Sequence, residues 1–225
     1  MKIFDKEIIS LHIEGLNELI SYYKEYDLLS SEIRDRSNFH CLPGCGACCM
    51  TASSNIEVSL FEIIPMAIQI IQTNQEESFL QLLSDQEISS KPCVMYHKTS
   101  KSGNLGYCTS YGDRPMICRL FGGSSRIYKQ GERRLVLCKL LKDNQYLSQE
   151  VLESVANEMP ICSDISAFVR GLNSDLGNAF YPINIALKMA IELVLFRLHW
   201  LHPEKPEPDS PPFDTAPLGN FPSAA

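Results

Sequence analysis

The sequence has no long uncharged hydrophobic run and no excess of positive charge. The best candidate for a membrane span, residues 183–201, contains the charged residues Lys188, Glu192 and Arg197. It therefore predicts a buried or amphipathic helix, and we expect no membrane partner. The chain has 27 Asp and Glu residues against 20 Lys and Arg residues, a net charge of -7. Nucleic acid is an unfavourable partner for such a chain, because phosphate binding needs a basic surface.

A signal-peptide pattern is also lacking. Asp5, Glu7 and Glu14 interrupt the apolar runs near the N-terminus, and no small-residue cleavage site follows one. We therefore expect a cytoplasmic protein. One segment is basic although the whole chain is acidic. It contains Arg126, Lys129, Arg133 and Arg134. A solvated hairpin face explains that patch better than a binding site does.

Cysteine is abundant. The chain contains nine cysteines, an odd number that fits poorly with a closed set of disulfides. In a reducing compartment such residues are metal ligands, redox groups or small buried side chains. Four of them fall within nine residues as Cys41-x3-Cys45-x2-Cys48-Cys49, beside Pro43 and Gly44. Four cysteines beside proline and glycine are unsuited to packing in a hydrophobic core, so the pattern predicts metal binding.

The pattern of apolar residues and turn residues predicts a mainly α fold with one or two small β-hairpins, built around a cysteine-cluster metal-binding domain. Helices are expected over residues 3–35, 56–72, 75–83, 148–156, 164–170 and 183–199, and hairpins over 93–108 and 125–138. We divide the chain into an N-terminal helical segment (1–37), the cysteine-cluster domain (38–140), C-terminal helices packed on that domain (141–202) and a Pro-rich tail (203–225). The tail holds seven of the thirteen prolines and is expected to be disordered or extended.

A helix beginning near Gly44 to Gly46 would place Cys45, Cys48 and Cys49 on one face. Its N-terminus would stabilise thiolates, which are the form that binds zinc or iron. Adjacent helical side chains point roughly 100° apart, so Cys48 and Cys49 serve one ion only with distortion. Three explanations stay open: one of the two cysteines is a packing residue, the site is polynuclear, or two metals lie side by side.

The other cysteines are spread along the chain. Cys93 and Cys108 flank the first expected hairpin, as in half of a zinc ribbon, and Cys138 ends the second. Cys118 follows Arg114-Pro115, and Cys162 stands outside the group. The candidate metal ligands are Cys41, Cys45, Cys48, Cys49, Cys93, Cys108, Cys118 and Cys138.

The cluster also has candidate supporting side chains. Arg114 and Arg119 could neutralise the thiolates by hydrogen bonding, and Tyr111 could pack over the cluster. The alternative is that both arginines pair with surface acids such as Asp113.

These motifs resemble the YkgJ-type CxxCxxCC family of zinc- or iron-chelating domains. The resemblance rests on Cys45-Gly46-Ala47-Cys48-Cys49, on Cys93, and on the spacing from Cys108 through Tyr111, Arg114, Pro115 and Cys118 to Arg119 and Phe121. Cys41 lies one residue further upstream than a strict CxxC pattern would place it. The resemblance implies metal binding more firmly than any activity. The cysteine region is also similar to that of flagellin lysine N-methylases.

Three functions remain open. The leading hypothesis is a protein that coordinates zinc or an iron–sulfur cluster through cysteine thiolates, with a redox or group-transfer role. The second is an enzyme resembling the lysine methyltransferases. The third is a zinc-stapled module that binds a protein partner through its first helix and its tail.

Overall fold

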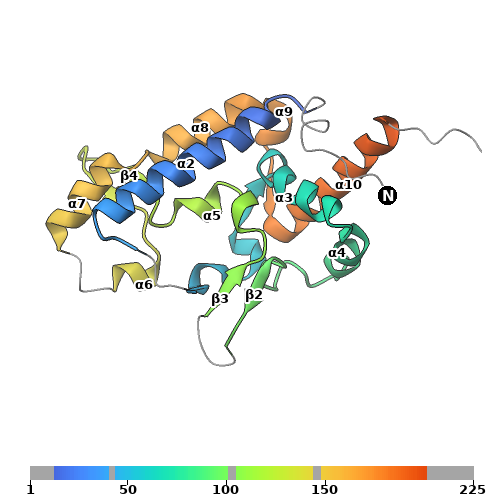
Figure 1. Ribbon diagram of the computed structural model, residues 1–225, viewed down its shortest axis with the longest axis horizontal. Coiled ribbons are helices and arrows are strands. Elements are labelled where there is room, and N and C mark those ends of the chain that lie inside the picture. The colour runs from blue at the N-terminus through green and yellow to red at the C-terminus, as the bar shows by residue number, and fades with distance from the viewer. Residues whose placement is uncertain (1–12, 41–43, 101–104, 144–147, 202–225) are drawn as a thin grey trace, which may run out of the picture.

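The computed structural model describes residues 13–40, 44–100, 105–143 and 148–201. Its helices are α2 (Leu16–Arg36), α3 (Leu60–Gln72), α4 (Glu76–Leu83), α5 (Ile117–Leu120), α6 (Lys139–Lys142), α7 (Gln149–Glu158), α8 (Cys162–Leu172), α9 (Ser174–Gly177) and α10 (Ile183–Leu201). Its strands are β1 (Glu57–Ser59), β2 (Tyr96–Lys98), β3 (Gly106–Cys108), β4 (Ser125–Ile127), β5 (Arg133–Leu135) and β6 (Phe180–Pro182). The fold is mainly helical with small antiparallel strand pairs, as predicted (Figure 1).

The first long helix is not continuous as predicted, and residues 3–12 of the expected helix lie outside the described residues. α2 begins at Leu16 because Gly15 adopts φ 74°, which breaks the continuous helix expected over residues 3–35. A side chain at Gly15 would also meet the carbonyl oxygen of Leu172 at 2.4 Å. Gly15 therefore lets α2 pack closely against α8, and the two helices lie side by side in Figure 1.

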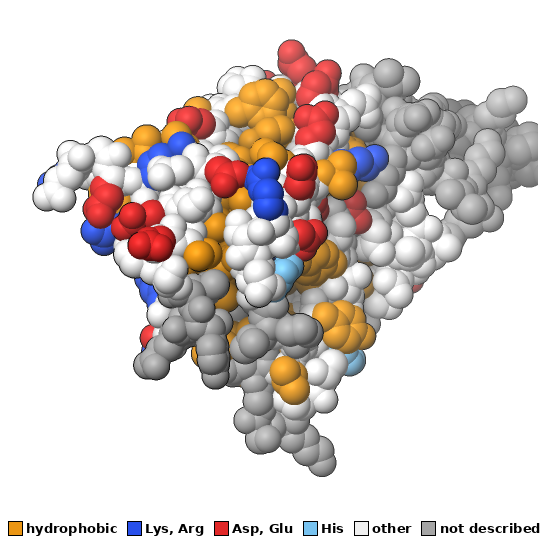
Figure 2. Space-filling view, turned by 60° about the vertical axis from the view of Figure 1, so that its left-hand side comes forward, with side chains coloured by type: hydrophobic (Ala, Val, Ile, Leu, Met, Phe, Trp, Pro, Cys, Tyr) orange, Lys and Arg blue, Asp and Glu red, His pale blue; other side chains and the backbone are white. Residues whose placement is uncertain are grey.

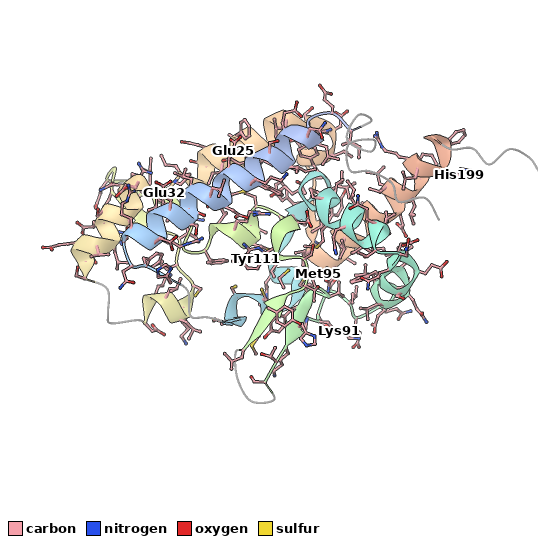
Figure 3. The ribbon with its side chains drawn as sticks, viewed as in Figure 1. Glu25, Glu32, Lys91, Met95, Tyr111 and His199 are labelled. Atoms are coloured by element: carbon pink, nitrogen blue, oxygen red, sulfur yellow. The ribbon has the colours of Figure 1, made fainter. Side chains whose placement is uncertain are left out.

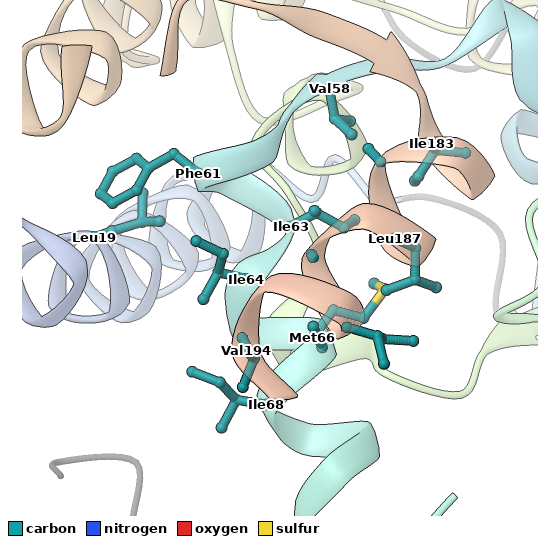
Figure 4. Packing of buried hydrophobic residues seen from close by; sticks show 14 of the residues in the cluster. Leu19, Val58, Phe61, Ile63, Ile64, Met66, Ile68, Ile183, Leu187 and Val194 are labelled. Carbon is teal, nitrogen blue, oxygen red and sulfur yellow. The ribbon is translucent and has the colours of Figure 1, made fainter. Parts of the chain in front are cut away.

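α3 forms the centre of the main hydrophobic core. It begins with a capping box, in which the Ser59 hydroxyl accepts from the Glu62 backbone N–H and the Glu62 carboxylate accepts from the Ser59 backbone N–H. Its apolar residues are buried around almost the whole helix: Phe61, Ile63, Ile64, Met66, Ala67, Ile68, Ile70 and Ile71. α10 packs along α3, and Figure 4 shows Leu187 and Val194 of α10 facing this surface. The two helices therefore depend on each other for burial.

Three two-stranded sheets occur in the described residues, where one or two hairpins were predicted. Two are the predicted hairpins, β2–β3 and β4–β5. The third, β1–β6, pairs Val58 with Tyr181 across 123 positions of the chain. It joins the strand that leads into α3 to the strand that leads into α10, so it aligns the two core helices.

A second, smaller hydrophobic cluster lies at the other end of α2. It is made of Ile33, Phe39, Leu141, Val155 and Met159, and α7 packs there on β5. On the face shown in Figure 2, acidic and basic side chains are interspersed with exposed hydrophobic ones. No helix in the described part of the chain is long and apolar enough to cross a membrane. The division at residues 37, 140 and 202 stays a prediction, and the Pro-rich tail lies outside the described residues.

Candidate metal centre

A cavity of about 510 Å³ lies between α2, the β2–β3 hairpin and α5. Seven cysteines line it, and they come from widely separated parts of the chain: Cys45, Cys48, Cys49, Cys93, Cys108, Cys118 and Cys138. The eighth predicted ligand, Cys41, lies outside the described residues. Cys162 lines a different cavity, which agrees with its separate place in the sequence.

The segment that carries Cys45, Cys48 and Cys49 is not an α-helix. Only a three-residue 3₁₀ turn forms, at Ala47–Cys49, because Gly44 takes φ 67° and Cys45 pairs with Leu105 in a β-bridge. The expected stabilisation of thiolates by a helix N-terminus is therefore wrong for this segment. Instead, the Gly44 carbonyl accepts a hydrogen bond from the Gly106 N–H at 2.9 Å. This bond fastens the cysteine segment to the hairpin.

Tyr96 fills the space between that segment and the hairpin. A Cβ added at Gly46 or Gly106 would lie 2.3 or 2.4 Å from Cε2 of the Tyr96 ring. Both positions therefore need glycine. Gly46 allows the segment to approach Tyr96 of the hairpin, and Gly106 allows the same ring to pack across the two strands, so the cysteines of the segment and the hairpin share one cavity.

Cys48 and Cys49 point toward each other, with their sulfur atoms 3.8 Å apart. The hydrogen bond between the two thiol groups lowers the pKa of Cys48 to about 6, and the positive charge of Arg114 acts in the same direction. The same hydrogen bond raises the pKa of Cys49, and burial adds to that effect. Thiolates on one tetrahedral zinc ion, with bonds of about 2.3 Å, have their sulfurs about 3.8 Å apart. The pair therefore already has the spacing of two ligands on one ion.

Cys93, Cys108 and Cys118 form the inner wall of the cavity. Burial raises the pKa of all three thiols, that of Cys93 to about 12. Negative charge on Cys93, Cys108 or Cys48 would raise the pKa of Cys118 further. A bound cation reverses this effect, because it stabilises the thiolate form.

The donor atoms suit zinc or iron. The described cysteines are free thiols, and soft sulfur ligands favour zinc and iron–sulfur centres over magnesium or calcium. Within the described ranges, no three Cys, His, Asp or Glu side chains already stand in a ligand geometry. Closure of a metal site would therefore require thiols to turn further into the cavity.

Arg114 and Tyr111 lie at the mouth of this cavity. The Arg114 guanidinium stacks 3.4 Å from the centre of the Tyr111 ring and donates to the backbone carbonyls of Tyr111 (2.9 Å) and Cys118 (3.3 Å). Its charge helps to lower the pKa of Cys48 and offsets part of the rise that burial causes in the pKa of Cys108 and Cys118. Figure 3 shows Tyr111 between α5 and the β2–β3 hairpin. These contacts suit the expected role of Arg114 as a counter-charge for thiolates.

Arg119 has a different environment. Its side chain is fully buried, forms an ion pair with Asp27 of α2, and donates to the carbonyls of Arg114 (2.8 Å) and Gly112 (2.7 Å). It also stacks over the Tyr23 ring at 4.3 Å. The sequence considered surface acids such as Asp113 as partners, and the structure pairs Arg119 with Asp27 of α2. Arg119 ties α2 to the segment that carries Cys118, and its charge offsets part of the rise that burial causes in the pKa of Cys108.

One wall of the cavity was not anticipated. Polar residues of α2 and of the segment after it face the thiols: Asp27, Ser30, Ser31, Arg34 and His40. Their spacing in α2, at positions i, i+3 or i+4, and i+7, is that of one helical face. That periodicity is visible in the sequence, but a polar helix face is usually solvated, so it did not indicate a cavity wall.

The model of the CxxCxxCC family, described as "Putative zinc- or iron-chelating domain", matches residues 40–149. We call residues 40–149 the CxxCxxCC region. The CxxCxxCC region contains every cysteine that lines the 510 Å³ cavity, together with Tyr111, Arg114 and Arg119. It leaves out α2, α8 and α10. No curated protein and no solved structure matched the chain.

Proposed function

We propose that the CxxCxxCC region binds zinc or iron through the thiolates that line the cavity, with Cys41 as a further ligand. One observation carries this proposal: seven cysteines that are distant in sequence line the same cavity. Single cysteines are often small buried side chains, but packing alone gives no reason for so many thiols to share one space. The proposed ligands are Cys45, Cys48, Cys49, Cys93, Cys108, Cys118 and Cys138.

Serine substitutions test the ligand set. We expect Cys48→Ser, Cys49→Ser, Cys108→Ser and Cys118→Ser each to lower the metal content of the purified protein. Cys162→Ser is the matched control, because Cys162 is also a half-buried thiol but lines another cavity. Metal content would be measured by elemental analysis. If all four variants keep the metal content of the Cys162→Ser control, the thiol site is not the metal site.

The nature of the metal centre is a narrower proposal. The 3.8 Å spacing of the Cys48 and Cys49 sulfurs supports two thiolates on one ion, as in a zinc site or at one iron of a two-iron cluster. It supports a four-iron cluster less well, because there four thiolates serve four separate irons. Absorption spectra, together with iron, zinc and sulfide analysis of protein purified without oxygen, distinguish zinc from an iron–sulfur cluster. A colourless protein with stoichiometric zinc favours zinc, and a brown protein with iron and sulfide favours the cluster.

The size of the cavity favours a redox or group-transfer role over a purely structural metal. A space of about 510 Å³ is far larger than an ion needs, and small-molecule sites span about 300–1,000 Å³. Catalytic metal sites keep a position open, whereas structural zinc sites are closed by four protein ligands. Calorimetric titration with S-adenosylmethionine tests the methyltransferase-like alternative. A metal centre that binds no small molecule and only folds the chain would favour the protein-interaction module.

A further inference from the structure

A second cavity, of about 590 Å³, lies on the other side of α5. The β4–β5 hairpin, α7 and the start of α8 form its walls. The charged side chains around it are four bases, Arg126, Arg133, Arg134 and Lys142, and one acid, Glu153. This balance is the reverse of that of the whole chain, which has 27 acids and 20 bases.

The four cations differ in how they are held. Arg133 is anchored by hydrogen bonds to the Ser125 hydroxyl (3.0 Å) and the Met159 carbonyl, neither of which neutralises its charge. Arg134 pairs with Glu132. Arg126 and Lys142 are exposed, and no ion pair involves either of them within the described part of the chain. The cavity therefore keeps unneutralised positive charge at its edge.

Apolar side chains make up part of the lining, namely Leu120, Phe121, Leu135, Leu137 and Leu152. A cavity lined by both apolar side chains and cations suits a ligand with an apolar body and an anionic head. Guanidinium groups match the flat oxygen pairs of carboxylates and phosphates.

We propose that this second cavity binds a small organic oxyanion, a carboxylate or phosphate attached to an apolar body. The volume lies within the range of small-molecule sites, about 300–1,000 Å³, and the cations provide the selectivity for the head group. This site is separate from the proposed metal centre. Ile117 and Phe121 line both cavities, so α5 is the wall between them.

The test is calorimetric titration of the full chain, as purified, with three matched probes. They are 2-naphthoate, 2-naphthyl phosphate and the neutral 2-naphthalenemethanol. We expect one or both anions to bind at least tenfold more tightly than the alcohol, and the tighter anion identifies the head group. Equal binding of all three probes, or no binding, would overturn the proposal.

Charge-removing variants locate the site. The double variant Arg126→Gln/Lys142→Gln should weaken binding of the preferred anion at least tenfold, because both lost cations border the cavity. Lys129→Gln is the matched control, since Lys129 belongs to the same hairpin but does not line the cavity; its affinity should stay within twofold of wild type. A double variant that binds like wild type, or a control that loses as much affinity, would refute the assignment.

A space-filling variant gives an independent answer if the charge variants alter folding. Ser166 lines the cavity from α8 and is only partly exposed, so Ser166→Phe should block the anion without removing a cation. Metal content should be unchanged in every one of these variants. That measurement separates a failure of the anion site from a failure of the metal site.

Discussion

At the scale of single residues, the adjacent cysteines show that helical geometry alone does not set the distance between two thiols. Adjacent side chains diverge by roughly 100° in an α-helix and by about 120° in a 3₁₀ turn. Cys48 and Cys49 lie in the 3₁₀ turn at Ala47–Cys49, and their side chains nevertheless bring the sulfurs to 3.8 Å. Two of the explanations considered from the sequence give the two thiols separate roles: one of them is a packing residue, or two metals lie side by side. The 3.8 Å spacing supports neither of these explanations.

Glu62 shows the cost of burying a carboxyl group that also caps a helix. Burial raises its pKa above the usual value, against the hydrogen bonds from Ser59. The folded protein thus holds the proton of the Glu62 carboxyl group more tightly than the unfolded chain does. The stability that the protonated Glu62 contributes is therefore present below pH 4.5 and is lost as the pH rises through the pKa of the folded state. Glu62→Gln keeps the capping hydrogen bonds without the charge. We expect it to raise the melting temperature at pH 7 more than at pH 4.

The control for that substitution is Glu57→Gln, on the exposed side of β1. Thermal unfolding of both variants and of the wild type would be followed from pH 4 to pH 7. A melting-temperature difference for Glu62→Gln that does not depend on pH would contradict this account.

Arg119 is expected to be the most sensitive position near the cavity for stability. Breaking a buried ion pair costs about 3–5 kcal/mol; Asp27 is 39% exposed, so we expect Arg119→Gln to cost about 3 kcal/mol. Arg134→Gln is the control, because its ion pair with Glu132 is exposed and such pairs contribute less than about 1 kcal/mol. Urea unfolding measures the loss of unfolding free energy in both variants. Equal losses would show that Arg119 does not hold α2 in place.

At the scale of elements, local signals predicted several elements, and long-range ones were invisible. The apolar stretches of α3 and α10 and the turn residues of the two hairpins predicted those elements from the sequence. The helix expected at Cys45–Cys49 was wrong. The β1–β6 pair could not be predicted, because three-residue strands 123 positions apart leave no local pattern. The grouping of Cys93, Cys108 and Cys118 followed from their motifs. The α2 wall of the same cavity required the tertiary structure.

The contact between the hairpin and the cysteine segment gives a prediction at this scale. Gly106→Ala would place a methyl group 2.4 Å from the Tyr96 ring and 2.6 Å from the His97 carbonyl oxygen. Tyr96 and His97 both belong to β2, so the methyl group must displace the Tyr96 ring or part β3 from β2, and either movement disturbs the contact with the segment that carries Cys48. We expect a loss of about 1–3 kcal/mol in unfolding free energy and weaker metal binding, measured by competition with a chelator.

Gly112→Ala is the control for that substitution. An added Cβ at Gly112 meets nothing within 4 Å, so we expect stability within about 0.5 kcal/mol of wild type and unchanged metal affinity. If Gly106→Ala behaves in the same way, close approach of the hairpin is not needed for the site.

At the scale of the whole molecule, the family match and the folding core do not coincide. The CxxCxxCC region ends at residue 149, but α3 within it is buried against α10, which begins at Ile183. The cysteine-lined cavity therefore rests on helices from both sides of the matched region.

This mismatch predicts the behaviour of fragments. Residues 40–149 alone should expose the apolar surface of α3 and aggregate or unfold without cooperativity, whereas residues 13–201 should melt cooperatively. Size-exclusion chromatography and circular dichroism would compare the two. A fragment of residues 40–149 that melts at the same temperature as residues 13–201 would show that α10 is dispensable.

The separation of α3 from α10 also has a consequence for biosynthesis. Ile183 lies 111 positions after Gln72, and ribosomes add about 5–20 residues per second. Roughly 6–22 s therefore pass between completion of α3 and the first residue of α10. All seven cavity cysteines leave the ribosome before α10 does. The nascent chain thus presents its thiols together with an uncovered α3, so metal loading can precede closure of the core.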